Sequence, residues 1–280
     1  MSSSQGSAEL QRMDTPLGSL SFRQAGAAAP THVLLHGIGS ASGSWQAQLA
    51  WAQGRSDVGL LAWDAPGYGS SSPVAPAQPQ AGDYAQRLWT WLDALGVQGP
   101  LVLVGHSLGA LMAARAALLR PHQVKHLLLL SPARGYGDAP AAERERMVAG
   151  RLNNLQQLGP AGMAQARAAA MLSPQATPAM VEQVRRTMAA IDPAGYTQAV
   201  HLLAQGRLLH DVSQLRLPVT VASGEADTIT VPAACDEVAA AAGVRRLSLG
   251  AVGHACAVEA AQVVIDLLQA SSARDGQGHE

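Results

Sequence analysis

The sequence predicts an α/β fold: a mostly parallel sheet that is flanked by helices and carries an inserted helical lid. Short apolar runs alternate with longer helical stretches, which is typical of parallel strands buried on both faces. The alternation stops between Ser131 and Leu217, where helical segments follow one another without a strand. A chain of 280 residues can form one large core with an inserted subdomain.

The apolar runs define the candidate strands. The first candidate, Gly18–Gln24, alternates in the manner of an edge strand, and the others are continuous apolar runs: Thr31–Leu35, Gly59–Trp63, Leu101–Val104, His126–Leu130, Val219–Ala222 and Arg246–Leu249. Between them, helices are predicted at Ser44–Ala52, Asp83–Leu95, Ser107–Arg120, Pro232–Ala242 and Val258–Ala270. These helices supply the right-handed crossovers that parallel strands need.

The segment without strands is divided into consecutive helices by Pro160, Pro174, Pro178 and Pro193. We expect an all-helical insert between two strands of a parallel sheet to sit on top of the sheet as a lid. The predicted organisation is a flexible leader over 1–14, a core over 15–134 and 216–270, a lid over 135–215 and a flexible tail over 271–280.

Composition restricts the partners. The formal charge is −1, from 19 basic and 20 acidic residues, whereas nucleic acid and anionic membranes require a basic surface. A small neutral or singly charged substrate fits better. Cys235 and Cys256 form no Cys-x-x-Cys pair, the first residues lack the apolar core of a secretory signal, and no apolar stretch could cross a bilayer. We expect a soluble, cytoplasmic protein; its oligomeric state is not specified by the sequence.

A candidate nucleophile is Ser107, at the centre of the G-x-S-x-G motif that follows the apolar run at Leu101–Val104. A serine hydroxyl is a weak nucleophile and needs an exposed position on a strained turn, next to a base and a helix N-terminus. Gly105 and Gly109 allow the backbone to bend sharply and the strand and helix to pack closely. The strand–turn–helix context therefore favours nucleophilic catalysis over a chance motif.

The base and the acid are sought on loops after strands, where open α/β sheets place their sites. Among nine histidines, His254 stands on a loop between the last predicted strand and the last helix, and it is the candidate base. Asp227 follows an apolar strand and is the candidate acid that orients the base. It could instead only cap the turn before Pro232. Competing carboxylates are Glu225, the nearest, and the weaker candidates Asp211, Asp236 and Asp138.

Acyl transfer also requires N–H donors for the oxyanion. The backbone N–H of Leu108, directly after the nucleophile, is one candidate. The other is Ile38, in the glycine-containing loop 36–40, although this loop could be only a tight turn into the next helix. A second glycine turn, at 64–71, is interpreted as architectural.

Five motifs now carry a family resemblance: HGIGS, DAPGYGSS, GHSLG, SGEAD followed by Pro232, and GHA. In their order and contexts, over roughly residues 15–270, the chain resembles the serine-nucleophile branch of the α/β-hydrolase superfamily. Within it, GMAQARAAAML and DPAGYTQAV are similar to the lids of 3-oxoadipate enol-lactonases, a group that stands near small carboxylesterases. The resemblance implies an eight-stranded sheet, the triad Ser107, Asp227 and His254, and oxyanion donors at Ile38 and Leu108.

The first functional hypothesis is hydrolysis of a small carboxylic ester or lactone through an acyl-enzyme. Alternatives are a cofactor-free perhydrolase or acyltransferase and a carbon–carbon bond hydrolase of aromatic degradation, although the loop 39–43 lacks the proline usual in the latter. Aspartate replaces the serine in dehalogenases and epoxide hydrolases, which disfavours both. A ligand-binding protein without turnover is a further alternative.

Substrate contacts are predicted for Gly37, Arg134 and Met171. Glycine at position 37 allows close backbone approach, Arg134 could meet a substrate carboxylate, and the lid methionines could form an adaptable pocket wall. Alternatively, Arg134 is a solvated loop residue and the methionines only pack helices. We expect no metal, because no histidine–carboxylate cluster has ligand spacing, and no cofactor.

Overall fold

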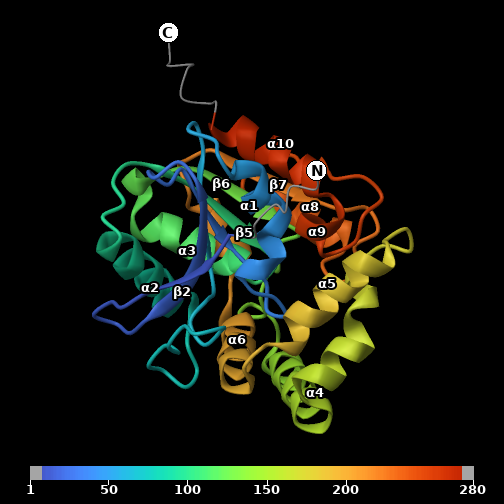
Figure 1. Ribbon diagram of the computed structural model, residues 1–280. Coiled ribbons are helices and arrows are strands. Elements are labelled where there is room, and N and C mark those ends of the chain that lie inside the picture. The colour runs from blue at the N-terminus through green and yellow to red at the C-terminus, as the bar shows by residue number, and fades with distance from the viewer. Residues whose placement is uncertain (1–7, 273–280) are drawn as a thin grey trace.

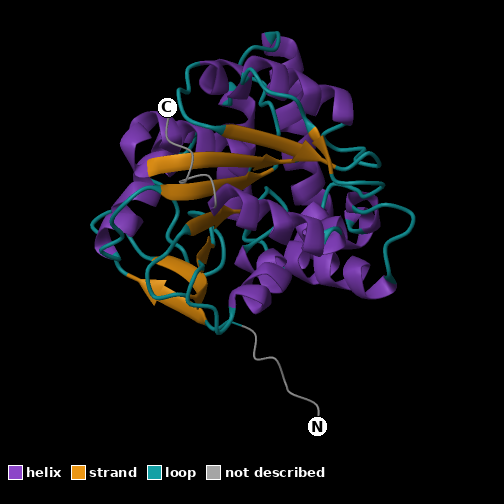
Figure 2. Ribbon diagram, turned by 90° about the horizontal axis from the view of Figure 1, so that it is seen from above, coloured by secondary structure: helices purple, strands orange, loops and turns teal. Residues whose placement is uncertain are grey.

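A central sheet of eight strands, in the order β1-β2-β4-β3-β5-β6-β7-β8, runs through the molecule with helices on both sides (Figure 2). The computed structural model describes residues 8–272. β1 pairs with β2, and β2 with β4, in antiparallel fashion, and all other neighbours are parallel. The strands are β1 (Leu10–Met13), β2 (Leu20–Gly26), β3 (His32–Leu35), β4 (Gly59–Trp63), β5 (Leu101–His106), β6 (Val124–Leu130), β7 (Val219–Ser223) and β8 (Leu247–Ser248).

Both faces of the parallel strands are covered, because successive side chains point to opposite faces. On β5, Leu101 and Leu103 belong to one apolar cluster and Val102 and Val104 to the other. The first cluster is completed by α2 (Ala81–Ala94), α3 (Gly109–Leu119) and α8 (Pro232–Ala241), and the second by α1 (Gln46–Ala52), α9 (Cys256–Glu259) and α10 (Ala261–Ser272). This two-sided burial explains why the strands are continuous apolar runs in the sequence.

The segment between β6 and β7 is helical, as the sequence predicted. It contains α4 (Ala141–Arg167), α5 (Pro178–Ala189), α6 (Pro193–Gln205) and α7 (Leu208–Ser213). α4, α5 and α6 gather on one side of the molecule (Figure 1), whereas α7 packs against the core helices α3 and α8. α4 is kinked at Gly159, which has a positive φ of 60°, followed by Pro160 inside the helix.

The structure differs from the sequence analysis at the chain ends and in some helix bounds. Leu10–Met13, placed in a flexible leader, form β1, and α10 runs to Ser272, two residues into the expected tail. β1 is mostly exposed and gave no burial signal, because a polar edge strand is held mainly by backbone pairing. The remaining leader residues 1–7 and tail residues 273–280 lie outside the described residues.

The last predicted helix is two helices, α9 and α10, and α3 begins at Gly109 rather than at the serine. Within residues 8–272, no helix is long and apolar enough to cross a bilayer.

Two glycines allow β5 and α3 to approach each other and β3 closely. A Cβ on Gly105 would lie 2.6 Å from the Gly109 oxygen, and one on Gly109 would lie 2.2 Å from the Leu35 oxygen. Both distances are far below van der Waals contact with rigid backbone atoms. Any side chain at these positions would therefore push the strand, the turn and the helix apart.

We predict that Gly109→Ala lowers the free energy of unfolding by roughly 3 kcal/mol or more, because the added methyl group overpacks the junction. Gly150→Ala in α4 is the matched control, since its Cβ would meet nothing within 4 Å. This control should raise stability by about 0.5–1 kcal/mol through helix propensity. Denaturant unfolding followed by circular dichroism measures both. Equal effects would contradict the steric interpretation.

Candidate active site

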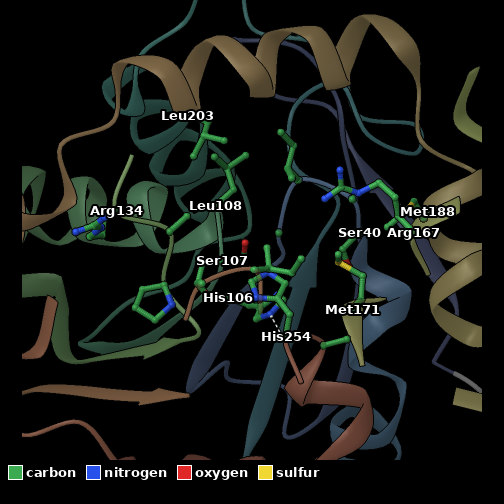
Figure 3. Close-up of a pocket in the computed structure, with 18 of the residues that line it drawn as sticks. Ser40, His106, Ser107, Leu108, Arg134, Arg167, Met171, Met188, Leu203 and His254 are labelled. Atoms are coloured by element: carbon green, nitrogen blue, oxygen red, sulfur yellow. Dashed lines mark hydrogen bonds between the residues drawn. The ribbon is translucent and has the colours of Figure 1, made fainter. Parts of the chain in front are cut away.

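Ser107 lies on the sharp turn between β5 and α3 with a left-handed backbone, at φ 53°. Such a conformation is uncommon for a residue with a side chain and costs roughly 1–3 kcal/mol, so the surroundings must hold it. The backbone N–H of Ser107 donates to the backbone oxygen of Leu130 at 3.0 Å, and the backbone carbonyl oxygen of Ser107 accepts from the N–H groups of Ala110 and Ala133. The turn presents the side chain at the floor of a cavity (Figure 3).

His254 and Asp227 form a buried hydrogen-bonded pair. The Nδ1–H of His254 donates to Oδ2 of Asp227 at 2.9 Å, and Asp227 is only 2% exposed. Its Oδ1 accepts the backbone N–H groups of Ile229 and Thr230, so the aspartate also caps the turn, as the alternative reading proposed. Burial alone would raise the pKa of Asp227. The contacts with His254 and the two N–H groups outweigh burial and lower that pKa to about 2.

Ser107 and His254 line the same cavity, with Asp227 behind His254. Within residues 8–272, no hydrogen bond joins the Ser107 hydroxyl to the His254 ring. Contacts between nucleophile and base are often longer in free enzymes than in substrate complexes. The structure thus brings the three sequence-predicted residues into one site.

The sequence analysis missed two side chains that hold His254. The Thr230 hydroxyl lies 2.9 Å from Asp227 Oδ2, 3.1 Å from His254 Nδ1 and 3.0 Å from the Ser131 oxygen. His106 donates its Nε2–H to the His254 backbone oxygen at 2.8 Å. Burial, followed by the nearby His254, lowers the pKa of His106 to about 3, so this ring stays neutral. His106 stands beside Ser107 in the motif, but only the fold shows what it contacts.

Within the described residues, none of the competing carboxylates is hydrogen-bonded to His254. Each of them pairs with an arginine: Glu225 and Asp236 with Arg246, Asp211 with Arg115, and Asp138 with Arg207. Glu225 is exposed, and its hydrogen bond to Arg246 lowers its pKa.

The loop after β3 lies against the serine. A Cβ on Gly37 would be 3.0 Å from the Ser107 Cβ, so a side chain here would crowd the serine. The Tyr68 hydroxyl donates to the Ile38 oxygen at 2.8 Å. The glycine turn interpreted as architectural therefore also fixes this loop. Within the described part of the chain, no hydrogen bond uses the backbone N–H of Ile38 or Leu108.

His36 also fixes this loop. Its Nδ1–H donates to the Gly37 oxygen at 2.8 Å, while its Nε2 accepts the Ala65 N–H at 3.0 Å. Burial lowers the pKa of His36 and favours this neutral form. The carbonyl oxygens of Gly37 and Ile38 are thus both held by side-chain hydrogen bonds.

The cavity above Ser107 measures about 500 Å³, the size of a site for a small molecule. From the helical segment between β6 and β7, Met163, Met171 and Met188 form part of its wall, and all three are buried. Gly37, Arg134 and Met171, the predicted substrate contacts, all line it. Arg134, however, is exposed and forms an ion pair with Glu237.

A mostly parallel sheet, a serine on a strained turn after β5 and a helical insert after β6 define the α/β-hydrolase class. Residues 27–254 match the model of the family described as "Serine aminopeptidase, S33". The chain therefore belongs to this family of the α/β-hydrolase superfamily.

The curated relatives differ widely in the share of their own length that this chain matches. A putative carbamate hydrolase, RutD of Klebsiella pneumoniae, is 30% identical over 82% of this chain and 86% of its own length. Polyketide synthase ThaQ of Burkholderia thailandensis is 27% identical over 89% of this chain, which spans only 12% of ThaQ. The human (lyso)-N-acylphosphatidylethanolamine lipase is 32% identical over 36% of this chain, with 29% of the lipase covered.

Solved structures agree on the fold. A hydrolase from Pseudomonas aeruginosa aligns with a TM-score of 0.81 at 27% identity, covering 95% of this chain and 98% of that one. The enol-lactonase of Burkholderia xenovorans aligns with a TM-score of 0.80 at 20% identity, covering 93% and 99%. The predicted superfamily and eight-stranded fold are thereby confirmed.

Proposed function

We propose that this protein hydrolyses a small carboxylic ester or lactone through an acyl-enzyme on Ser107. One observation carries the proposal: a serine with a left-handed backbone lines the same cavity as a histidine that is bound to a buried carboxylate. This is the geometry of nucleophilic acyl transfer.

His254 is the proposed base. Because Nδ1–H donates to Asp227, Nε2 is the ring nitrogen left to accept the Ser107 proton. Oγ of Ser107 then attacks the carbonyl carbon, and Asp227 stabilises the resulting imidazolium. The tetrahedral intermediate collapses as His254 returns the proton to the departing alcohol oxygen. A water molecule, deprotonated by the same histidine, attacks the acyl-enzyme. The bond to Ser107 Oγ then breaks, His254 returns the proton to Oγ, and the acid is released.

The N–H groups of Ile38 and Leu108 are the proposed oxyanion donors. Both residues line the cavity, and Leu108 directly precedes the first turn of α3. Donors that are already oriented need no reorganisation as charge develops, and removing one such donor typically costs roughly 3 kcal/mol. The Tyr68 contact to the Ile38 oxygen supplies this orientation.

The lid is proposed to determine substrate choice. α4 and α5 contribute Met163 and Met188 to the cavity, and the turn after α4 contributes Met171, whereas the sheet side contributes the reacting groups. Flexible thioether side chains adapt to acyl groups of different shape.

A carbamate is the second candidate substrate, favoured by the 30% identity to RutD. Its carbonyl would use the same nucleophile, base and donors, so the two candidates differ only in the group beside the carbonyl. A panel of short esters, lactones and carbamates, compared by kcat/KM, distinguishes them.

We predict that Ser107→Ala and His254→Ala each lower ester turnover by roughly four to six orders of magnitude, and that combining them costs little more, since the residues act as a unit. Ser131→Ala is the matched control: this buried serine also has a positive φ, 44°, but does not line the cavity. The control should keep nearly full activity. More than a tenth of wild-type activity in Ser107→Ala would refute the nucleophile.

The acid is tested by Asp227→Asn, which we expect to lower kcat by roughly four orders of magnitude, because the amide cannot stabilise the correct tautomer and cation of His254. Glu225→Gln should change kcat less than about twofold, since the Glu225 side chain is exposed and pairs with Arg246 rather than with His254. Steady-state kinetics at neutral pH measures both. The opposite order would assign the acid to Glu225.

The loop that carries Ile38 is tested by Tyr68→Phe. Losing one neutral hydrogen bond, worth about 0.5–1.5 kcal/mol, should lower kcat by about 2- to 10-fold with little change in KM. Tyr84→Phe is the control, because the buried Tyr84 hydroxyl has no partner within the described residues. Equal kcat values for the two variants would show that the Tyr68 contact does not orient the donor.

A further inference from the structure

Arg167 brings a positive charge to the cavity from the lid. It ends α4, and its guanidinium points into the cavity above Ser107, near Ser40 and Met188 (Figure 3). The side chain is partly buried. In the part of the chain that the structure describes, the side chain of Arg167 forms no ion pair and no hydrogen bond.

The other charged side chains around the cavity differ from Arg167. Arg134 is paired with Glu237, Asp138 with Arg207, and Arg151 donates to the Tyr196 hydroxyl at 3.4 Å. Glu143, the remaining acidic group of the wall, is exposed and lies in the first turn of α4, at the opposite end of this kinked helix. Among the described arginines of the wall, Arg134 is ion-paired and Arg151 has one long hydrogen bond, whereas all side-chain donors of Arg167 are left available.

Methionine side chains form much of the cavity wall near Arg167, and Ser40 also lies near its guanidinium. Met163 precedes Arg167 by four residues on α4, the spacing that places side chains on one face of a helix. Met171 ends the short 3-10 turn Ala169–Met171 that follows α4, and both methionines line the cavity. Met188 of α5 lies across from it. A guanidinium against thioether walls has few competing acceptors, and its planar fork matches a carboxylate with two parallel hydrogen bonds.

We propose that Arg167 binds a carboxylate of the substrate, so that the preferred substrate is an ester or lactone that bears a carboxylate remote from the scissile carbonyl. The proposal rests on the proposed function, because it concerns the same cavity. Arg167 would set specificity and hold the substrate against Ser107 without taking part in bond making. The apolar wall would contact the carbon skeleton between the two groups.

Two pairs of isosteric substrates test the proposal. On the acyl side, mono-p-nitrophenyl adipate is compared with the neutral p-nitrophenyl ester in which an isopropyl group replaces the carboxylate. On the alcohol side, an acetylated hydroxybenzoate is compared with the matching isopropylphenyl acetate. In at least one pair the anionic ester should have a kcat/KM about tenfold higher or more, mainly through a lower KM.

Variants then assign this preference. Arg167→Gln should lower kcat/KM for the preferred anionic ester about tenfold or more and change the neutral ester less than about twofold. Arg167→Lys should retain part of the preference, and Arg167→Glu should invert it. Arg186→Gln is the control, because Arg186 is exposed on α5, pairs with Glu182 and does not line the cavity. It should change neither ester.

Three results would overturn the inference: no anionic preference in either pair, equal losses for both esters in Arg167→Gln, or a selective loss in Arg134→Gln instead. Failure of the proposed function looks different. In that case the neutral esters themselves would not be hydrolysed in a way that depends on Ser107. Neutral turnover that requires Ser107, combined with any of the three results, refutes the role of Arg167 alone.

Discussion

The close contact of three backbone segments at the β5–α3 junction is the constraint on which the site depends. The backbone around Gly105 and Gly109 is too close to its neighbours for a side chain at either position, so the chain turns sharply at Ser107 between them. The left-handed φ of Ser107 is the consequence, and hydrogen bonds from the backbone of the neighbouring strands hold it. A strained serine at a helix N-terminus is thereby presented to the cavity in a fixed position, before any substrate binds.

The remaining groups reach this serine because parallel strands end at the same edge of the sheet. The loop after β3 supplies Gly37 and Ile38, the loop after β7 supplies Asp227, and the loop after β8 supplies His254. Tyr68 and His36 hold the first loop, and the Thr230 hydroxyl ties the second loop to the Ser131 backbone oxygen after β6. Within the second loop, the N–H groups of Ile229 and Thr230 fix Asp227. His106 links the turn at Ser107 to the loop after β8 through the backbone oxygen of His254.

The sequence predicts most of what local pattern determines. Buried strands such as Gly59–Trp63 have an unmistakable apolar signature, and the motif around Ser107 requires a sharp turn. What escaped prediction depends on tertiary contacts. β1 is an exposed polar strand defined by its pairing with β2, and the contacts of Thr230 and Tyr68 join residues from different loops. Arg134 was predicted as a substrate contact from its place after a strand, whereas the orientation of Arg167 depends on the kink and packing of α4.

The most direct test of the central claim is the covalent reaction of Ser107 with a small fluorophosphonate, followed by peptide mass spectrometry of the whole chain. Ser107 lies on the turn between strand and helix that presents it to the cavity, and His254, the proposed base, lines the same cavity. We expect one stoichiometric adduct, located on Ser107 and formed much more slowly in Asp227→Asn. An adduct on another serine, or the same rate in Asp227→Asn, would contradict a nucleophile activated by this histidine and carboxylate.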